Sequence, residues 1–287
     1  MLAVIGTIPD ENMPLTVGAV AWRDGGLWLA ERSCAVGRGT AALLAAASRA
    51  ASVFPGVELC AVVAGDTGRG DGSRAIYAWL TEHLPHLSYS TLVFHYLQPD
   101  VDWHGRVLLA ALAMAHKPVL IADAGFMYVA KMGGMADQYD FFTPDAGELA
   151  FLADEQAPHP FYTRGFLLRD GQSSPELIAR AYQHGNAARY LLVKGAVDML
   201  ARDGQVIAQV EQPSFPAMEA IGGTGDTLTG VLAALCEAGL PPPKAALLAA
   251  RCNRHCGDFP GLTPATQIGE LIVRIPAVLR QIQMSDG

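Results

Sequence analysis

Charged residues are scarce in this chain, and positive ones are scarcer than negative ones. Asp, Glu, Lys and Arg make up 17% of the 287 residues, and the formal net charge is −8. Lysine and arginine form no run, so the positive surface that binds nucleic acid is missing and we expect no nucleic-acid partner. Disorder is excluded as well, because 51% of the residues are hydrophobic.

Cysteine is rare, and long hydrophobic runs are absent. The five cysteines are an odd number without paired spacing, which argues against a disulfide framework and indicates a reducing compartment. The N-terminus lacks the basic and apolar regions of a secretory signal. Apolar runs such as 40–47 and 231–235 fall far short of the roughly 20 residues that cross a bilayer. We therefore expect a cytoplasmic protein without a membrane partner.

Several catalytic motifs are missing too. The chain has no Gly-x-Ser-x-Gly elbow, no metalloprotease spacing among its eight histidines, and no Gly-Lys-Ser/Thr after a glycine-rich loop. Cys252, His255 and Cys256 lie close in sequence, but no second ligand pair follows at a zinc-like distance. We interpret the two cysteines as part of the core. The glycine-rich segment 65–70 fits a ligand loop and a plain strand-to-helix turn equally well.

What the chain does contain is an alternation of short apolar runs and longer alanine-rich stretches. Strand followed by helix, repeated several times, predicts an α/β protein with a mostly parallel sheet covered by helices on both faces. The runs predicted as strands are 57–64, 92–96, 118–122, 139–142 and 190–193, and those predicted as helices are 73–83, 103–115 and 175–184.

The two ends of the chain differ from this middle part. Residues 1–35 contain a predicted β-hairpin, with strands 15–22 and 27–32 around 23–26, and a second hairpin is predicted over 199–210. The last third is predicted to be helical, over 227–238, 243–256 and 268–283. The loop 154–165 is the best candidate for an insertion. No long linker is visible, so we expect residues 1–287 to form one domain.

The most informative motif is the glycine-rich segment 220–230, which runs directly into an apolar helix. Gly222, Gly223, Thr224 and Gly225 allow the backbone to approach a ligand, and free N–H groups at a helix start attract an anion. This segment therefore predicts a phosphate cradle. Asp226 has two interpretations: a capping residue of the helix, or a general base acting on a hydroxyl beside the bound phosphate.

A second motif, Thr-Pro-Asp-Ala-Gly-Glu, follows the predicted strand 139–142. Asp145 and Glu148 are three residues apart and would share one face of a helical turn. Such a pair suits Mg²⁺, which takes one or two carboxylates and fills its remaining positions with waters and phosphates. Acidic enrichment in the first turn of a helix explains the pair without a metal.

Polar residues also end two other predicted strands. Lys194 and Gly195 follow the strand 190–193, and Asp123 follows the strand 118–122. Ligands of open α/β sheets bind outside the carboxyl ends of the strands, so both ends are candidate ligand positions. A solvated residue at a strand end is the alternative for each.

Taken in order, these motifs resemble the ribokinase-like superfamily, and residues 218–235 look most like the ADP- or ATP-dependent NAD(P)H-hydrate dehydratases. The resemblance implies a three-layer αβα fold with ATP or ADP and Mg²⁺ as cofactors. It implies that Asp226 is the catalytic base and that Glu148 helps to organise the metal. The remaining roles it implies are an anion hole and nucleotide contacts at Gly222, Gly223, Thr224, Gly225, Lys194 and Gly195, and substrate contacts at Asp123 and Asp145.

The chain departs from the dehydratase pattern at two places. The dehydratases usually carry His-Pro-Gly-Glu where this chain has 145–148, and Gly-Pro-Gly-Leu-Gly where it has 96–100. Residues 123–133 instead resemble hydroxymethylpyrimidine and pyridoxal kinases. A small-molecule kinase is therefore one alternative, and a degenerate nucleotide-binding protein is another. The expected partners are a nucleotide and a small-molecule substrate. The sequence leaves the oligomeric state open, a homo-oligomer included.

Overall fold

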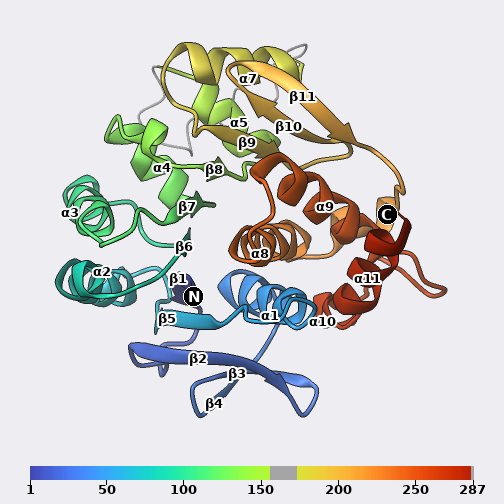
Figure 1. The fold of residues 1–287 in the computed structure, drawn as a ribbon, viewed down its shortest axis with the longest axis horizontal. Helices are drawn as coiled ribbons and strands as arrows, with labels where there is room; N and C mark the ends of the chain where they lie inside the picture. Colours follow the sequence, from blue (N-terminus) through green and yellow to red (C-terminus); the bar gives the residue numbers. More distant parts are fainter. Residues whose placement is uncertain (156–172, 286–287) are drawn as a thin grey trace.

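The computed structural model describes residues 1–155 and 173–285, and one mixed sheet passes through this part of the chain (Figure 1). The strand order is β11-β10-β9-β8-β7-β6-β1-β5-β2-β3-β4. The central strands from β9 to β5 are parallel, and antiparallel strands extend both edges. The strands are β1 (Leu2–Ile8), β2 (Thr16–Arg23), β3 (Gly26–Leu29), β4 (Arg32–Cys34), β5 (Leu59–Gly65), β6 (Thr91–His95), β7 (Val119–Ala122), β8 (Phe141–Phe142), β9 (Tyr190–Val193), β10 (Asp198–Arg202) and β11 (Gln205–Val210).

Helices cover both faces of this sheet, as the alternating pattern predicts (Figure 1). One layer contains α1 (Thr40–Ala51), α8 (Thr224–Glu237), α9 (Pro242–His255), α10 (Ile268–Ile272) and α11 (Ile275–Ser285). The other contains α2 (Asp71–His83), α3 (Val101–Leu112), α4 (Gly125–Met132), α5 (Ala146–Ala153) and α7 (Ser174–Gln183). The α/β class and the helix–sheet–helix layering are therefore confirmed.

The central strand β1 shows why the sheet needs two helical layers. Leu2, Val4 and Ile8 belong to one hydrophobic core, and Ala3 and Ile5 belong to the core on the opposite face. Successive side chains of a strand point to opposite faces, so an apolar run without polar alternation has to be covered on both sides. Because every described strand joins this sheet, we propose that the chain is organised as a single domain.

Both predicted hairpins are present. β2 pairs with β3 and β10 pairs with β11, each in antiparallel register. Asp24 and Gly25, with φ of 54° and 75°, form the first turn, and Asp203 and Gly204, with φ of 52° and 79°, form the second. Two central residues of positive φ are typical of the hairpin turn whose twist matches the strands.

Some elements differ from the prediction. The apolar runs over β1 and α1 are not predicted as a strand and a helix, because the hairpin signal dominates that region. The predicted helix 268–283 is divided into α10 and α11. The helix predicted from 227 begins at Thr224, so Asp226 lies inside its first turn. Most of the proposed insertion 154–165 lies outside the described residues.

The cysteines and the helices also bear on the expected compartment. All five cysteine thiols are free. Among the helices of the described ranges, none is both long and apolar enough to cross a membrane.

Helices α1 and α8 of the first layer pack closely against each other. A Cβ atom built on Gly230 of α8 would lie 2.3 Å from the carbonyl oxygen of Leu43 and 3.1 Å from the Cβ of Ala46, both on α1. Only glycine leaves room for this contact. The packing matters for the site, because it fixes the N-terminal end of α8 next to that of α1.

We expect Gly230→Ala to lower the free energy of unfolding by about 3 kcal/mol, since the added methyl group meets a backbone carbonyl that cannot turn away. Gly105→Ala in α3 is the matched control: its Cβ meets nothing within 4 Å, and it should raise stability by about 0.5–1 kcal/mol. Urea unfolding of both variants measures the difference. Equal effects would contradict the close packing of α1 on α8.

Candidate functional site

A cavity of about 500 Å³ lies at the carboxyl ends of the central strands, where the N-terminal end of α8 meets the sheet. Every residue that the sequence analysis selected lines it, although the residues come from four separate segments. They are Asp123, Asp145, Glu148, Lys194, Gly195, Gly222, Gly223, Thr224, Gly225 and Asp226. The parallel arrangement of the strands explains this convergence, since it brings their carboxyl ends to one edge.

The first turn of α8 presents free backbone amides to the cavity. Gly223 is the N-cap, and its φ of 101° favours glycine. Because glycine has no side chain, the turn has no side-chain cap. Within the described part of the chain, the amides of Thr224, Gly225 and Asp226 have no hydrogen-bond acceptor. These three N–H groups and the positive end of the helix dipole form a binding site for an anion.

The turn is held in place from α9. The Asn253 amide donates to the carbonyl of Thr224 over 3.0 Å, and its oxygen accepts a hydrogen bond of 2.7 Å from the Thr227 hydroxyl. The Arg38 side chain, from the segment before α1, lies against Gly222 and lines the cavity. The glycine-rich turn is therefore fixed by its neighbours.

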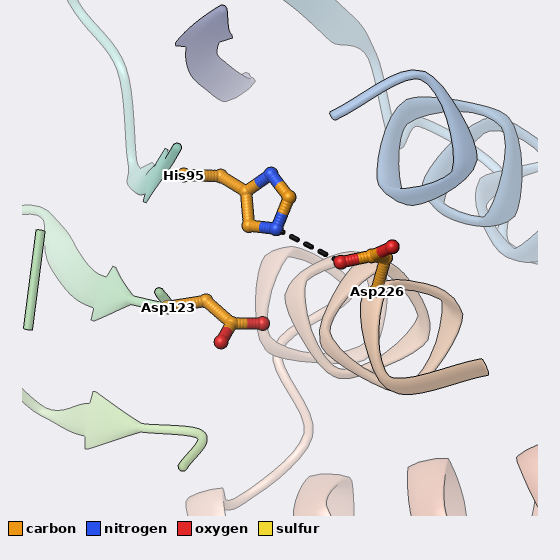
Figure 2. Close-up of side chains that lie close together, drawn as sticks. All are labelled: His95, Asp123 and Asp226. Carbon is orange, nitrogen blue, oxygen red and sulfur yellow. Dashed lines mark hydrogen bonds and ion pairs between the residues drawn. The ribbon is translucent and has the colours of Figure 1, made fainter. Parts of the chain in front are cut away.

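Asp226 does not cap its own helix. Its Oδ2 accepts a hydrogen bond of 2.6 Å from the amide of Gly39, and its Oδ1 lies 3.1 Å from Nε2 of His95 (Figure 2). Burial raises the pKa of Asp226, but the hydrogen bond from His95 and the nearby Lys194 ammonium outweigh it, so the pKa lies below that of an ordinary aspartate. The carboxylate is ionised at neutral pH and can accept a proton.

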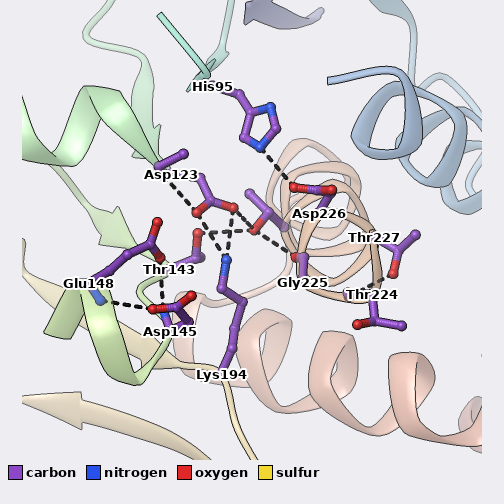
Figure 3. A network of polar contacts seen from close by, with 12 residues as sticks. His95, Asp123, Thr143, Asp145, Glu148, Lys194, Thr224, Gly225, Asp226 and Thr227 are labelled. Atoms are coloured by element: carbon purple, nitrogen blue, oxygen red, sulfur yellow. Dashed lines mark hydrogen bonds and ion pairs between the residues drawn. The ribbon is translucent and has the colours of Figure 1, made fainter. Parts of the chain in front are cut away.

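Lys194 and Asp123 form a buried ion pair beside this carboxylate. Nζ of Lys194 lies 3.0 and 3.1 Å from the two carboxylate oxygens of Asp123 (Figure 3). The Thr229 hydroxyl donates to Asp123 Oδ2 over 2.6 Å, and the amide of Ala124 donates to Oδ1. Burial lowers the pKa of Lys194, but the carboxylates of Asp123 and Glu148 raise it more, which keeps Lys194 charged. Asp123 thus serves first to hold Lys194.

Asp145 and Glu148 form a capping box at the start of α5. The Glu148 amide donates to Asp145 Oδ1 and the Asp145 amide donates to Glu148 Oε2, both over 2.8 Å. The Tyr128 hydroxyl donates to the other oxygen, Oε1, over 3.1 Å. Burial, with the charges of Asp123 and Asp145, raises the pKa of Glu148 to about 8 against the opposing charge of Lys194. The capping interpretation is therefore realised, and each Glu148 oxygen already has a partner.

Gly195 is held by a second buried ion pair that the sequence analysis did not identify. Nε of Arg254 lies 2.7 Å from Oδ2 of Asp198, and Asp198 Oδ1 accepts from the amide of Gly195. The Arg254 guanidinium also donates to the carbonyls of Gly195 and Ala196, both over 2.9 Å. The loop after β9 is thereby tied to the end of α9, which fixes one wall of the cavity.

A trio of ionisable side chains, His95, Asp123 and Asp226, has donor atoms within 4.8 Å of one another (Figure 2). Their facing atoms already have protein partners: Asp123 is bound by Lys194 and Thr229, and Asp226 by His95 and Gly39. We therefore assign no metal to this trio.

The comparisons with known proteins agree with this geometry. The family model for NAD(P)H-hydrate dehydratases matches residues 98–268, which includes α8 and most of the cavity. The chain belongs to the NAD(P)H-hydrate dehydratase family.

The family relatives differ in how much of their length this chain covers. The uncharacterized protein MJ1337 of Methanocaldococcus jannaschii is 37% identical over 83% of this chain and 98% of its own. The bifunctional NAD(P)H-hydrate repair enzyme Nnr of Pyrobaculum aerophilum is 31% identical over 61% of this chain and 32% of its own. The ADP-dependent (S)-NAD(P)H-hydrate dehydratase of Cenarchaeum symbiosum is 27% identical over 53% of this chain and 48% of its own. The chain thus spans less than half of the relatives that carry an activity in their names.

Solved structures confirm the ribokinase-like fold. A ribokinase-like superfamily protein of Enterococcus faecalis superposes with a TM-score of 0.62, over 98% of this chain and 86% of its own, at 14% identity. The pyridoxal kinase of Staphylococcus aureus with pyridoxal gives a TM-score of 0.56, over 92% and 91%, at 13% identity. At these identities the likeness concerns the fold alone.

After β6 the chain carries Tyr96, at the start of the segment where the resemblance to the dehydratases predicts a glycine-rich loop. Tyr96 adopts a positive φ of 49°. The residue is 46% exposed and lines the cavity, and its carbonyl accepts a hydrogen bond from Thr7. Tyr96 thus adopts a left-handed backbone conformation although it is not a glycine, and its aromatic ring lies beside the site.

Sequence reasoning missed His95 and Arg38. His95 ends β6, so the strand-end rule that selected Asp123 and Lys194 would have found it. Arg38 precedes a helix that was not predicted, and no local pattern connects it to the glycine-rich turn of α8.

Replacing Lys194 tests the buried ion pair. We expect Lys194→Met to lower the free energy of unfolding by about 3–5 kcal/mol at pH 7, because it leaves Asp123 buried without its cation. The double variant Lys194→Met/Asp123→Asn should recover at least half of this loss. Lys244→Met, at an exposed position of α9, is the control and should change stability by less than about 0.5 kcal/mol. Chemical denaturation measures all three, and a loss no larger than in the control would refute the pairing.

Proposed function

We propose that this protein catalyses the nucleotide-dependent dehydration of hydrated NAD(P)H, with ADP or ATP as the phosphoryl donor. The observation that carries the proposal is the ionised carboxylate of Asp226 beside three free amides at the start of α8, at the edge of a cavity. Family membership supports it, as does the activity named for the relative from Cenarchaeum symbiosum.

The amides of Thr224, Gly225 and Asp226 would bind the terminal phosphate of the nucleotide. The Arg38 side chain lies beside Gly222, where a Cβ atom would be 3.8 Å from its Cδ. The Lys194 ammonium lies beside Gly225, where a Cβ atom would be 3.4 Å from its nitrogen. Two cations and the helix N-terminus would stabilise the charge that builds up as the phosphoryl group moves, which is the main catalytic requirement of such transfers.

Asp226 would act as the general base. It takes the proton of the substrate hydroxyl, the hydroxyl oxygen attacks the terminal phosphorus, and the bond from phosphorus to the remaining nucleotide breaks. The resulting ester then loses phosphate with the electron pair of its carbon–oxygen bond. A proton leaves the neighbouring ring carbon, and the nicotinamide double bond is restored.

Magnesium fits the acidic side of the cavity through water. Both oxygens of Glu148 accept protein hydrogen bonds, and each keeps a further lone pair, so Glu148 and Asp145 would hold waters of the ion. When bound, Mg²⁺ would neutralise charge on the nucleotide phosphates. We also propose that the enzyme works in the cytoplasm, in keeping with its five free thiols.

A small-molecule kinase is the second candidate, because of Tyr96 and Asp145. Asp145 stands in place of the histidine of the dehydratases, and the exposed Tyr96 ring replaces their glycine-rich loop. A kinase shares the first step and stops at the phosphoester. A nucleotide-binding protein without turnover would show neither product.

Hydrated NADH with ADP, and separately with ATP, distinguishes these candidates. The proposal predicts recovery of the NADH absorbance together with release of one phosphate for each molecule repaired. Phosphoester formation on another hydroxyl compound without NADH recovery would favour the kinase.

Asp226→Asn should lower kcat by roughly 10²–10⁴-fold, because the amide cannot take the proton. Nucleotide binding, measured by calorimetry, should persist, since the amides of α8 are unchanged. Asp71→Asn, at an exposed position of α2, is the matched control and should keep full activity. A variant Asp226→Asn with normal turnover would remove this residue from the mechanism.

A further inference from the structure

His95 joins Asp226 to the start of α1 through a chain of hydrogen bonds. The ring is completely buried at the end of β6. Its Nδ1 lies 2.9 Å from the hydroxyl oxygen of Thr40, and its Nε2 lies 3.1 Å from Oδ1 of Asp226. Gly39, the neighbour of Thr40, donates directly to Oδ2. Two consecutive residues at the start of α1, the N-cap Gly39 and Thr40, therefore hold the same carboxylate, one directly and one through His95.

The ionised Asp226 carboxylate sets the direction of its bond with His95. An ionised carboxylate only accepts hydrogen bonds, so Nε2 of His95 carries a proton and donates a hydrogen bond to Asp226. When the ring is neutral, its Nδ1 is an acceptor and the Thr40 hydroxyl donates to it. Oδ1 of Asp226 accepts the bond from His95 and Oδ2 accepts the bond from Gly39. Each oxygen keeps a lone pair for the substrate.

The position of Asp226 makes such a restraint necessary. A carboxylate in the first turn of a helix tends to bind the free amides of that same turn. If Asp226 turned back onto α8, it would occupy the amides that would receive phosphate. In the structure it is directed toward β6 and α1 instead (Figure 3).

We propose that His95, supported by Thr40, is a positioning residue that holds Asp226 away from the amides of α8 and keeps it ready to accept a proton. This rests on the proposed function, in which Asp226 is the base. His95 directly precedes the segment 96–100 that departs from the dehydratase pattern, and its side chain reaches the base from there.

Other charged and titratable groups face Asp226 and are left unchanged by the test. These groups are Tyr96 after β6, Arg38 before α1, Asp123 after β7, Glu148 in α5 and Lys194 after β9.

The test compares His95→Leu, which removes the donor, with His95→Gln, which keeps an N–H group on a side chain of similar reach. The pKa of Asp226 is measured from the ¹³C signal of its carboxyl carbon, assigned by its loss in Asp226→Asn. The donor lowers this pKa, so we expect His95→Leu to raise it and to move the acid limb of kcat/KM to higher pH by the same amount. We expect kcat to fall by about 10- to 100-fold. His95→Gln should restore most of the original pKa of Asp226 and most of kcat.

Two substitutions of Thr40 provide a second, milder test, because they leave the His95 ring in place. Thr40→Val removes the hydroxyl donor and should raise the pKa of Asp226 in the same direction, whereas Thr40→Ser should leave it unchanged. If His95→Leu fails to fold, this pair decides the question. An unchanged Asp226 pKa in both His95→Leu and Thr40→Val would overturn the proposal.

The NMR measurement does not depend on turnover. If the unmodified enzyme dehydrates no NAD(P)H hydrate, the proposed function fails, while the pKa of Asp226 still shows whether His95 holds the carboxylate.

Discussion

The site depends on one constraint: the first amides of α8 stay unpaired while an aspartate of the same turn stays ionised beside them. These two conditions oppose each other, because a carboxylate at a helix N-terminus normally satisfies its own amides. The protein resolves the conflict by giving Asp226 stronger partners elsewhere, at Gly39 and His95. The close packing of α1 on α8 around Gly230 keeps Gly39, at the start of α1, within reach.

The remaining charges of the site are arranged around the same point. Lys194 is kept as an ammonium by Asp123, and the loop that carries it is tied to α9 through Arg254. On the acidic side, Glu148 is held by the capping box of α5 and by Tyr128. Under the proposed function, the amides and cations would bind phosphate, and the Glu148 carboxylate would hold waters of a metal ion. An acidic protein can bind an anionic nucleotide because the positive potential is local.

Sequence patterns predicted those parts of the site that are encoded by neighbouring residues. The glycine-rich turn of α8 is contiguous, and Asp123 and Lys194 end strands whose parallel order brings them together. The partners of Asp226 could not be predicted in this way. Gly39 and His95 are 187 and 131 residues away from it, and their contacts arise only after α1 and β6 come together with α8. The two interpretations of Asp226 were equally supported by sequence, and the direction of its side chain separates them.

A crystal structure with a nonhydrolysable ATP analogue and Mg²⁺ tests the central claim most directly. The account predicts that the terminal phosphate lies within hydrogen-bond distance of the amides of Thr224, Gly225 and Asp226, with the Asp226 carboxylate still bound to His95. A phosphate bound elsewhere, or an Asp226 side chain folded back onto those amides, would contradict it.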